Sequence, residues 1–143
     1  MTLLELTAVV FIVGLLGAMA VTRYGFSTLA DVGAQGFARR VSLDCLQARR
    51  AAISTGDNHL LRFTVAGGKA TQYALYRRQG GNLIQVDTVH VVPADVDVTT
   101  AGAVDVEFTF MGDALASYAI TVAAPDRTRT VTVSQATGKA LVQ

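Results

Sequence analysis

The chain has little cysteine, histidine, proline or charge, and each shortage narrows what it can be. One cysteine, Cys45, in 143 residues excludes an intrachain disulfide. The two histidines, His59 and His90, are isolated and lack metal-ligand spacing with Cys45. Charged residues make up 16% of the chain, against ~25% in soluble domains, and the formal net charge is +1. This balance indicates no bulk attraction to nucleic acid or to anionic lipid.

No set of residues typical of an enzyme stands out, so we expect neither catalysis nor a cofactor. Cys45 falls on an apolar helical face, and we interpret it as a small core residue rather than a nucleophile. We interpret the scattered aspartates as solvated turn residues: Asp95, Asp97, Asp113 and Asp126. A short basic and aromatic stretch is compatible with a contact to a neighbour or DNA, although we favour a solvated strand face: Tyr73, Tyr76, Arg77 and Arg78.

What the chain does have is an apolar amino terminus with one charge in it, Glu5. The next charged residue is Arg23, so the run is about as long as the roughly 20 residues that span a bilayer as a helix. No basic residue precedes it, which argues against a secretory signal and for a retained anchor. A carboxylate inside such a segment is costly in lipid and indicates a functional role with a partner.

The helical pattern continues past the apolar run. There is no proline before Pro93, and apolar residues recur at helical spacing until Gly56, a plausible C-terminal stop. A helix from Thr2 to Thr55 would be about 80 Å long at ~1.5 Å per residue. Its first half is apolar on all sides and its second half is amphipathic. Its interior glycines indicate either close helix packing or a stretch able to unwind: Gly14, Gly17 and Gly25.

After Gly56 the apolar period changes to two, which predicts short strands separated by turns. We place strands near residues 61–65, 71–77, 83–92, 104–110, 118–122, 131–133 and 141–142. These strands predict one antiparallel sheet whose apolar face covers the second half of the helix. The predicted fold is α+β, with a hydrophobic helix over 1–24 and a globular domain over 25–143, made of helix 25–55 and sheet 58–143.

The sequence Thr2-Leu3-Leu4-Glu5-Leu6, followed by an apolar helix, resembles the mature amino terminus of type IV pilins and type II secretion pseudopilins. Three further segments resemble the pseudopilin H and FimT-like group. The helix end at residues 46–56 is similar to its "AR-x-x-A-I-x-x-G" motif, residues 108–113 to its "F-x-x-x-G" motif, and residues 130–140 to its closing hairpin. Three family features are missing: the proline often found at position 22, a C-terminal disulfide loop and a clustered basic C-terminal patch.

The resemblance implies a subunit that polymerises through its amino-terminal helix. Met1 would be the processed, N-methylated first residue, and Met1, Thr2 and Glu5 would be the assembly residues. We expect Glu5 to pair with the Met1 amine of a neighbouring copy; the alternative is a Glu5 that reaches the headgroups of an isolated anchor. A buried carboxylate needs such a partner.

The implied partners are copies of the chain, other pilins or pseudopilins, prepilin peptidase and the inner-membrane assembly platform; nucleic acid is not expected. The implied location is the inner membrane before assembly and a periplasmic or extracellular filament afterwards. Two functions stay open, a subunit of the filament body and a minor subunit at the tip that starts assembly or binds cargo or DNA. A membrane-anchored domain outside any filament is a third.

Overall fold

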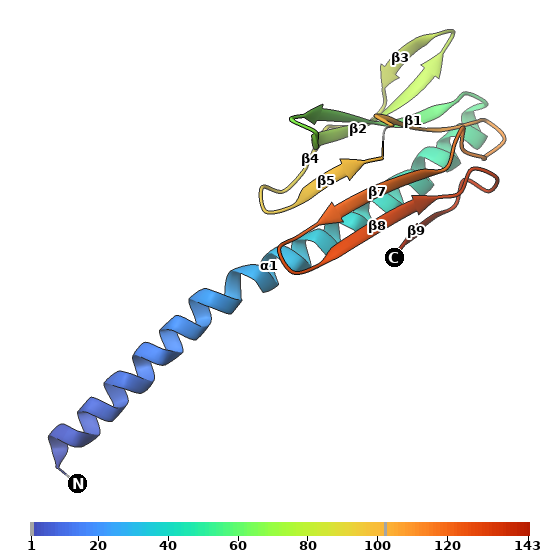
Figure 1. Ribbon diagram of the computed structural model, residues 1–143. Helices are drawn as coiled ribbons and strands as arrows, with labels where there is room; N and C mark the ends of the chain where they lie inside the picture. The colour runs from blue at the N-terminus through green and yellow to red at the C-terminus, as the bar shows by residue number, and fades with distance from the viewer. Residues whose placement is uncertain (1, 102) are drawn as a thin grey trace.

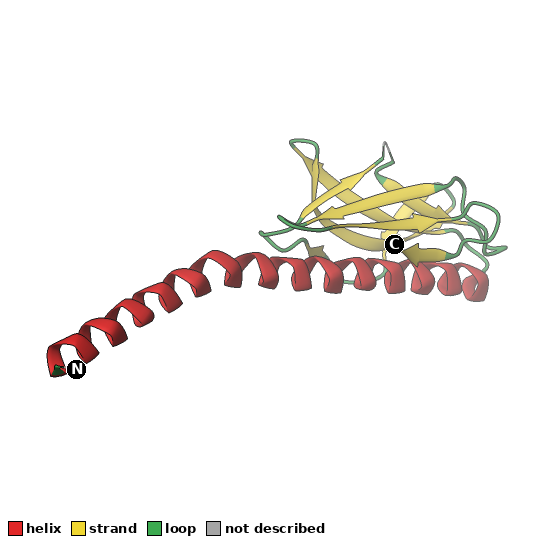
Figure 2. Cartoon of the chain, turned by 60° about the horizontal axis from the view of Figure 1, so that its bottom comes forward, coloured by secondary structure: helices red, strands yellow, loops and turns green. Residues whose placement is uncertain are grey.

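The fold is built on one long helix, α1 (Leu3–Thr55), in the computed structural model. The structure describes residues 2–101 and 103–143, with backbone alone for residues 21–28. The first half of α1 extends away from the rest of the molecule, and the second half lies along the β domain (Figures 1 and 2). Gly56 ends the helix with φ of 75°, and its N–H donates to the Ala52 carbonyl at 3.0 Å. The predicted helix and its glycine stop are therefore confirmed.

The two halves of α1 differ in what they bury. None of the segment Leu3–Ala20 is buried. From Ala30 onward one face turns inward, and its residues recur at three- and four-residue intervals because that spacing keeps side chains on one side of a helix. The buried members are Ala30, Ala34, Phe37, Ala38, Val41, Cys45, Ala48 and Ala52.

Two antiparallel sheets cover this face, where we predicted one. The first has the order β3 (Asn82–Gln85), β2 (Lys69–Gln79), β1 (His59–Ala66) and β6 (Asp105–Phe108), with β4 (His90–Val91) also paired to β2. The second has the order β5 (Asp97–Thr100), β7 (Tyr118–Ala123), β8 (Thr128–Val133) and β9 (Ala140–Val142). Both lie on the same side of α1 (Figure 2).

The predicted strands differ from the observed ones between β3 and β5, where the chain passes from the first sheet to the second. The strand predicted over 83–92 is two strands, β3 and β4, because a turn at Asp87 separates them. There the Thr88 N–H donates to the Asp87 carboxylate at 2.7 Å. Asp97, interpreted as a turn residue, instead begins β5, and Val98 beside it is fully buried. This short strand starts the second sheet.

The core lies between α1 and the two sheets. Cys45 is completely buried there, as predicted, and burial together with the neighbouring Asp44 carboxylate raises the pKa of its thiol. The rings of Phe63 and Tyr73 are tilted to each other with centres 5.2 Å apart, and Phe37 meets Tyr73 edge-on at 5.9 Å. The Tyr73 hydroxyl donates a hydrogen bond to the Asp44 carboxylate at 2.5 Å, so its polar end has a partner outside the aromatic cluster.

Candidate assembly site

Two of the predicted assembly residues, Thr2 and Glu5, lie at the free end of α1. Thr2 is the N-cap of the helix, and it forms a capping box with Glu5. The Glu5 N–H donates to the Thr2 hydroxyl at 3.4 Å, and the Thr2 N–H donates to the Glu5 carboxylate at 3.4 Å. Both bonds are longer than the usual 2.7–3.2 Å range and are therefore weak. Next to them the Thr7 hydroxyl donates to the Leu4 carbonyl at 2.9 Å.

This capping box is a role for Thr2 and Glu5 that we did not predict. The signal was present, because Thr-x-x-Glu before an apolar run is the signature of a capping box. A carboxylate in the first turn also lies at the positive end of the helix dipole. The arrangement holds the Glu5 carboxylate at the start of the helix, beside Thr2. No ion pair of Glu5 occurs among the described residues, and Met1, its expected partner in a neighbouring copy, lies outside them.

The apolar half of α1 is exposed on every side. Leu3 is 82% exposed and Phe11 is 70% exposed. A side chain added at Gly14 or Gly17 would meet no atom within 4 Å. So large an apolar surface is stable only in lipid or against other apolar helices. Its length and composition are those of a membrane-spanning helix.

The three domain segments quoted for the resemblance meet at the other end of α1. Arg49, near the helix end, donates from Nε to the Gly112 carbonyl at 2.7 Å. Gly138, in the closing hairpin, packs against the same carbonyl: a Cβ added there would lie 2.2 Å from the Gly112 oxygen and 3.1 Å from the Arg49 side chain. Arg49 thus holds the loop after β6 and the turn after β8 together. Segments that were separate motifs in the sequence form one contact in the fold.

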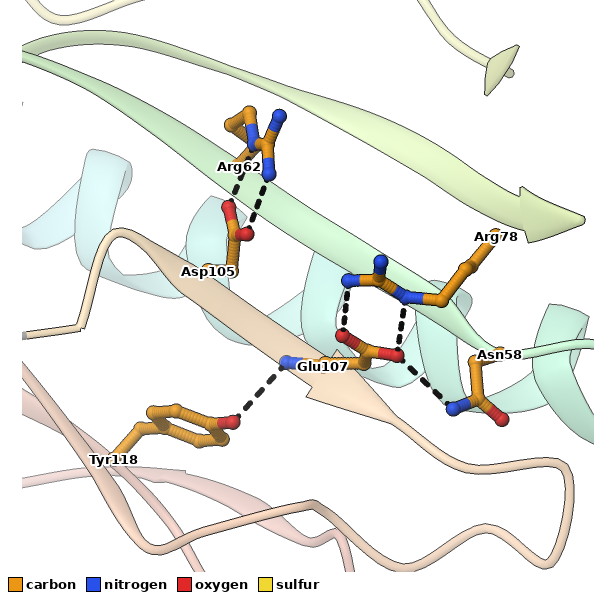
Figure 3. A network of polar contacts seen from close by, with 6 residues as sticks. All are labelled: Asn58, Arg62, Arg78, Asp105, Glu107 and Tyr118. Carbon is orange, nitrogen blue, oxygen red and sulfur yellow. Dashed lines mark hydrogen bonds and ion pairs between the residues drawn. The ribbon is translucent and has the colours of Figure 1, made fainter. Parts of the chain in front are cut away.

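The two arginines of the basic and aromatic stretch, Arg77 and Arg78, both form ion pairs. Arg78 forms two hydrogen bonds with Glu107 at 2.7 and 2.8 Å, and Asn58 donates to the same carboxylate at 3.0 Å (Figure 3). Arg62 contacts Asp105 in the same way, at 2.6 and 2.8 Å (Figure 3). These hydrogen bonds and ion pairs raise the pKa of both arginines. Each guanidinium charge is balanced locally, which favours the solvated strand face over a nucleic-acid patch.

The charge of Arg77 is also balanced by a carboxylate. Tyr73, by contrast, is part of the core. Arg77 pairs with Asp57, and the two side chains are about one-third exposed. Tyr73 is 1% exposed and belongs to the core, so it was wrongly included in a surface patch. Of the four residues suggested for this patch, Tyr76 lies beneath the Arg62 guanidinium, 5.9 Å from ring centre to Cζ.

The histidines occupy unrelated surroundings. His59 is 1% exposed, and its Nδ1 lies 3.0 Å from the Asp57 carbonyl. His90 lies beside α1, where Arg40 approaches its Nδ1 at 2.9 Å and Asp87 lies 3.6 Å from its Nε2. In the described part of the chain, no three His, Cys, Asp or Glu side chains converge in a way that could hold a metal ion.

Solved structures similar to this chain include a type IV minor pilin and a type II secretion minor pseudopilin. No family model matches the sequence, and no curated protein matches it. The type IV minor pilin FimU of Pseudomonas aeruginosa superposes in two crystal forms, with TM-scores of 0.62 and 0.64 at 15% identity. These matches cover 76% of this chain and 91% or 87% of FimU.

The minor pseudopilin EpsH from the Type 2 Secretion System of Vibrio cholerae superposes with a TM-score of 0.58 at 13% identity, covering 80% of this chain and 94% of EpsH. Both structures agree with the fold described above, a helix packed on antiparallel sheets. The predicted α+β fold is therefore confirmed, and the chain has the fold of type IV pilins and type II secretion pseudopilins.

Proposed function

We propose that this protein is a subunit of a type IV pilus-like or type II secretion pseudopilus filament, and that it polymerises through α1. The observation that carries the proposal is an exposed membrane-length helix, Leu3–Ala20, continuous with a helix that is packed into a pilin-type domain. Such a rod is anchored in the inner membrane before assembly. Its apolar half then exchanges lipid for the helices of other subunits in a periplasmic or extracellular filament.

In this proposal Glu5 pairs with the Met1 amine of a neighbouring subunit. A carboxylate moved from an aqueous or headgroup setting into a helix bundle needs a cation, since an unpaired buried charge costs several kcal/mol (~3–5). The capping contact with Thr2 supports the pairing by keeping the carboxylate at the start of the helix. The pair sets the axial register of adjacent helices. Prepilin peptidase would produce and methylate the Met1 amine, and an inner-membrane platform would deliver the subunit.

A second candidate is a minor subunit at the filament tip. The observation that favours it is the nature of the similar structures, which are a minor pilin and a minor pseudopilin. A minor subunit would use the same helix and the same Glu5 contact, but it would be present in few copies. It would start assembly or display a binding surface for secretion cargo or DNA.

The position of the chain in filaments tests the proposal. Cells are made to express the full chain with an epitope tag after Gln143, and sheared filaments are imaged by immunogold electron microscopy. Label along the whole length identifies a subunit of the filament body. Label at one end identifies a minor subunit. Absence from every filament, with the chain retained in the membrane, contradicts both candidates and leaves a membrane-anchored domain.

A further inference from the structure

The β domain exposes different chemistry at its two ends along α1. One end, here the proximal end, lies where the projecting half of the helix begins and carries the β7–β8 turn near Asp31 (Figure 1). The other, the distal end, carries the loop after β6 and the β8–β9 turn near Arg49 (Figure 1). Asp31 and Arg49 are 18 residues apart on one helix, which separates the two ends by about 27 Å at ~1.5 Å per residue.

The distal end carries a groove and two cations, Arg49 and Lys139, that form no ion pair with a described residue. The groove has a volume of about 960 Å³, and its lining includes Arg49, Met111, Asp113 and Gln135. Only Nε of Arg49 is used by Gly112. Neither Arg49 nor the exposed Lys139 at this end forms an ion pair within residues 2–101 and 103–143. Asp113 also lines the groove, and its carboxylate accepts a hydrogen bond from the Thr109 hydroxyl. Arg49, Lys139 and Asp113 together leave one positive charge at this end.

The loop after β6 also exposes large apolar side chains. Met111 is 77% exposed, and Phe110 and Leu115 are each 51% exposed. Three large apolar side chains beside unpaired cations are a combination that fits a protein surface carrying carboxylates and small apolar residues.

The proximal end has that composition. Asp95 and Asp126 are exposed there, and neither forms an ion pair with any described residue. A notch of about 250 Å³ at this end is lined by Asp95 and Asp97 and by small residues: Ala94, Ala123, Ala124 and Pro125. Two cations at this end are engaged, since Lys69 contacts Asp97 at 2.7 Å and Arg127 lies 3.9 Å from Asp31. Arg129 on β8 forms no ion pair with a described residue.

We infer that the distal groove at Arg49 receives the β7–β8 turn around Asp126 of a second copy of this chain. The contact is head-to-tail, so a pair of copies has a free groove at one end and a free turn at the other. Contacts of this kind propagate into an open filament unless they close into a ring. Asp126 then faces Arg49 and Lys139, and Met111 packs against the small residues of the notch. The inference rests on the proposed function and assigns a contact between β domains in addition to the helix contact.

Cysteine cross-linking within filaments tests this contact. The full chain is prepared with Met111→Cys and Asp126→Cys together in a Cys45→Ala background, and sheared filaments are oxidised with copper phenanthroline. Each subunit then carries one cysteine per contact surface. A head-to-tail contact predicts a ladder of dimers, trimers and longer covalent chains in a denaturing gel without reductant. Either single-cysteine variant should give no band above the dimer.

A matched pair places both cysteines at the distal end, Met111→Cys with Gln79→Cys, and should give no ladder. If Cys45→Ala lowers filament yield, the series is repeated with native Cys45, whose thiol is fully buried. Filaments that contain the double variant along their length but give no more ladder than the matched pair overturn the inference and leave the proposed function intact. Absence of the unsubstituted chain from filament bodies overturns the inference together with the first candidate function.

Discussion

Arg49 and Gly112 are 63 residues apart in the sequence, and the arginine Nε donates to the glycine carbonyl at 2.7 Å. Gly112 has φ of 89°, a conformation that favours glycine, and Ile53 on the next turn of α1 fills the space beside it. The contact attaches the loop after β6 to the end of the helix. It also fixes one wall of the distal groove that we assign to subunit contact.

Removing this contact should lower stability. We expect Arg49→Ala to reduce the free energy of unfolding by about 1–3 kcal/mol, because the Gly112 carbonyl loses a charge-assisted donor. Arg50→Ala is the matched control: Arg50 is the adjacent, exposed arginine, and its removal should cost under about 0.5 kcal/mol. Urea unfolding of the full chain in detergent measures both. Equal losses in the two variants would show that the Gly112 contact contributes nothing specific.

Gly138 should tolerate no side chain, whereas Gly56 should tolerate one better. Both have positive φ, at 60° and 75°, so alanine at either costs about 1–2 kcal/mol of left-handed strain. At Gly138 the new Cβ would also lie 2.2 Å from the Gly112 oxygen, while at Gly56 it meets nothing within 4 Å. Thermal unfolding should therefore rank Gly138→Ala well below Gly56→Ala in midpoint. The reverse order would contradict the close approach of the two distal loops.

The Glu107 network should matter more than the surface ion pairs. The Glu107 side chain is 7% exposed and satisfies both Arg78 and Asn58, so Glu107→Ala should cost about 2–4 kcal/mol. Asp97→Ala removes the Lys69 pair, in which both side chains are more than half exposed, and should cost under about 1 kcal/mol. Denaturant midpoints of the two variants give the comparison. A loss at Asp97 as large as that at Glu107 would show that burial does not govern these pairs.

The Cys45 thiol should not react with thiol reagents in the folded protein. Its thiol is fully buried and its pKa is raised, which suppresses the reactive thiolate. Incubation with a maleimide at neutral pH, followed by mass spectrometry, should show no adduct on the native full chain and complete labelling in urea. The exposed thiol of Met111→Cys provides the positive control under native conditions. Rapid native labelling of Cys45 would mean that the helix is not seated on the sheets as described.

Much of the helix was readable from the sequence because its signals are local. Apolar spacing, the absence of proline and Gly56 predicted a helix from Thr2 to Thr55, and the structure has Leu3–Thr55. Thr2 and Glu5 also match the capping-box signature, but we had interpreted these two residues only as assembly residues. Their proposed contact with Met1 of a neighbouring copy stays a prediction.

The second sheet was not readable because it depends on contacts between distant residues. Asp95-Val96-Asp97-Val98 looks like a polar turn in isolation, yet Val98 pairs with Val122 and is fully buried. Similarly, nothing local links Arg49 with Gly112 and Gly138, which are 63 and 89 positions away. Alternating apolar residues establish that a strand exists, but they do not establish which strands it pairs with.

Replacing Glu5 by glutamine tests its role in assembly most directly. Glutamine can still accept the Thr2 N–H in a capping box, so Glu5→Gln removes the charge and keeps the cap, whereas Glu5→Ala removes both. The measurement is the amount of full chain recovered in sheared filaments, relative to the amount in the membrane. The account predicts that both variants remain in the membrane and are lost from filaments to a similar extent. Filaments of normal length and yield from either variant would contradict it.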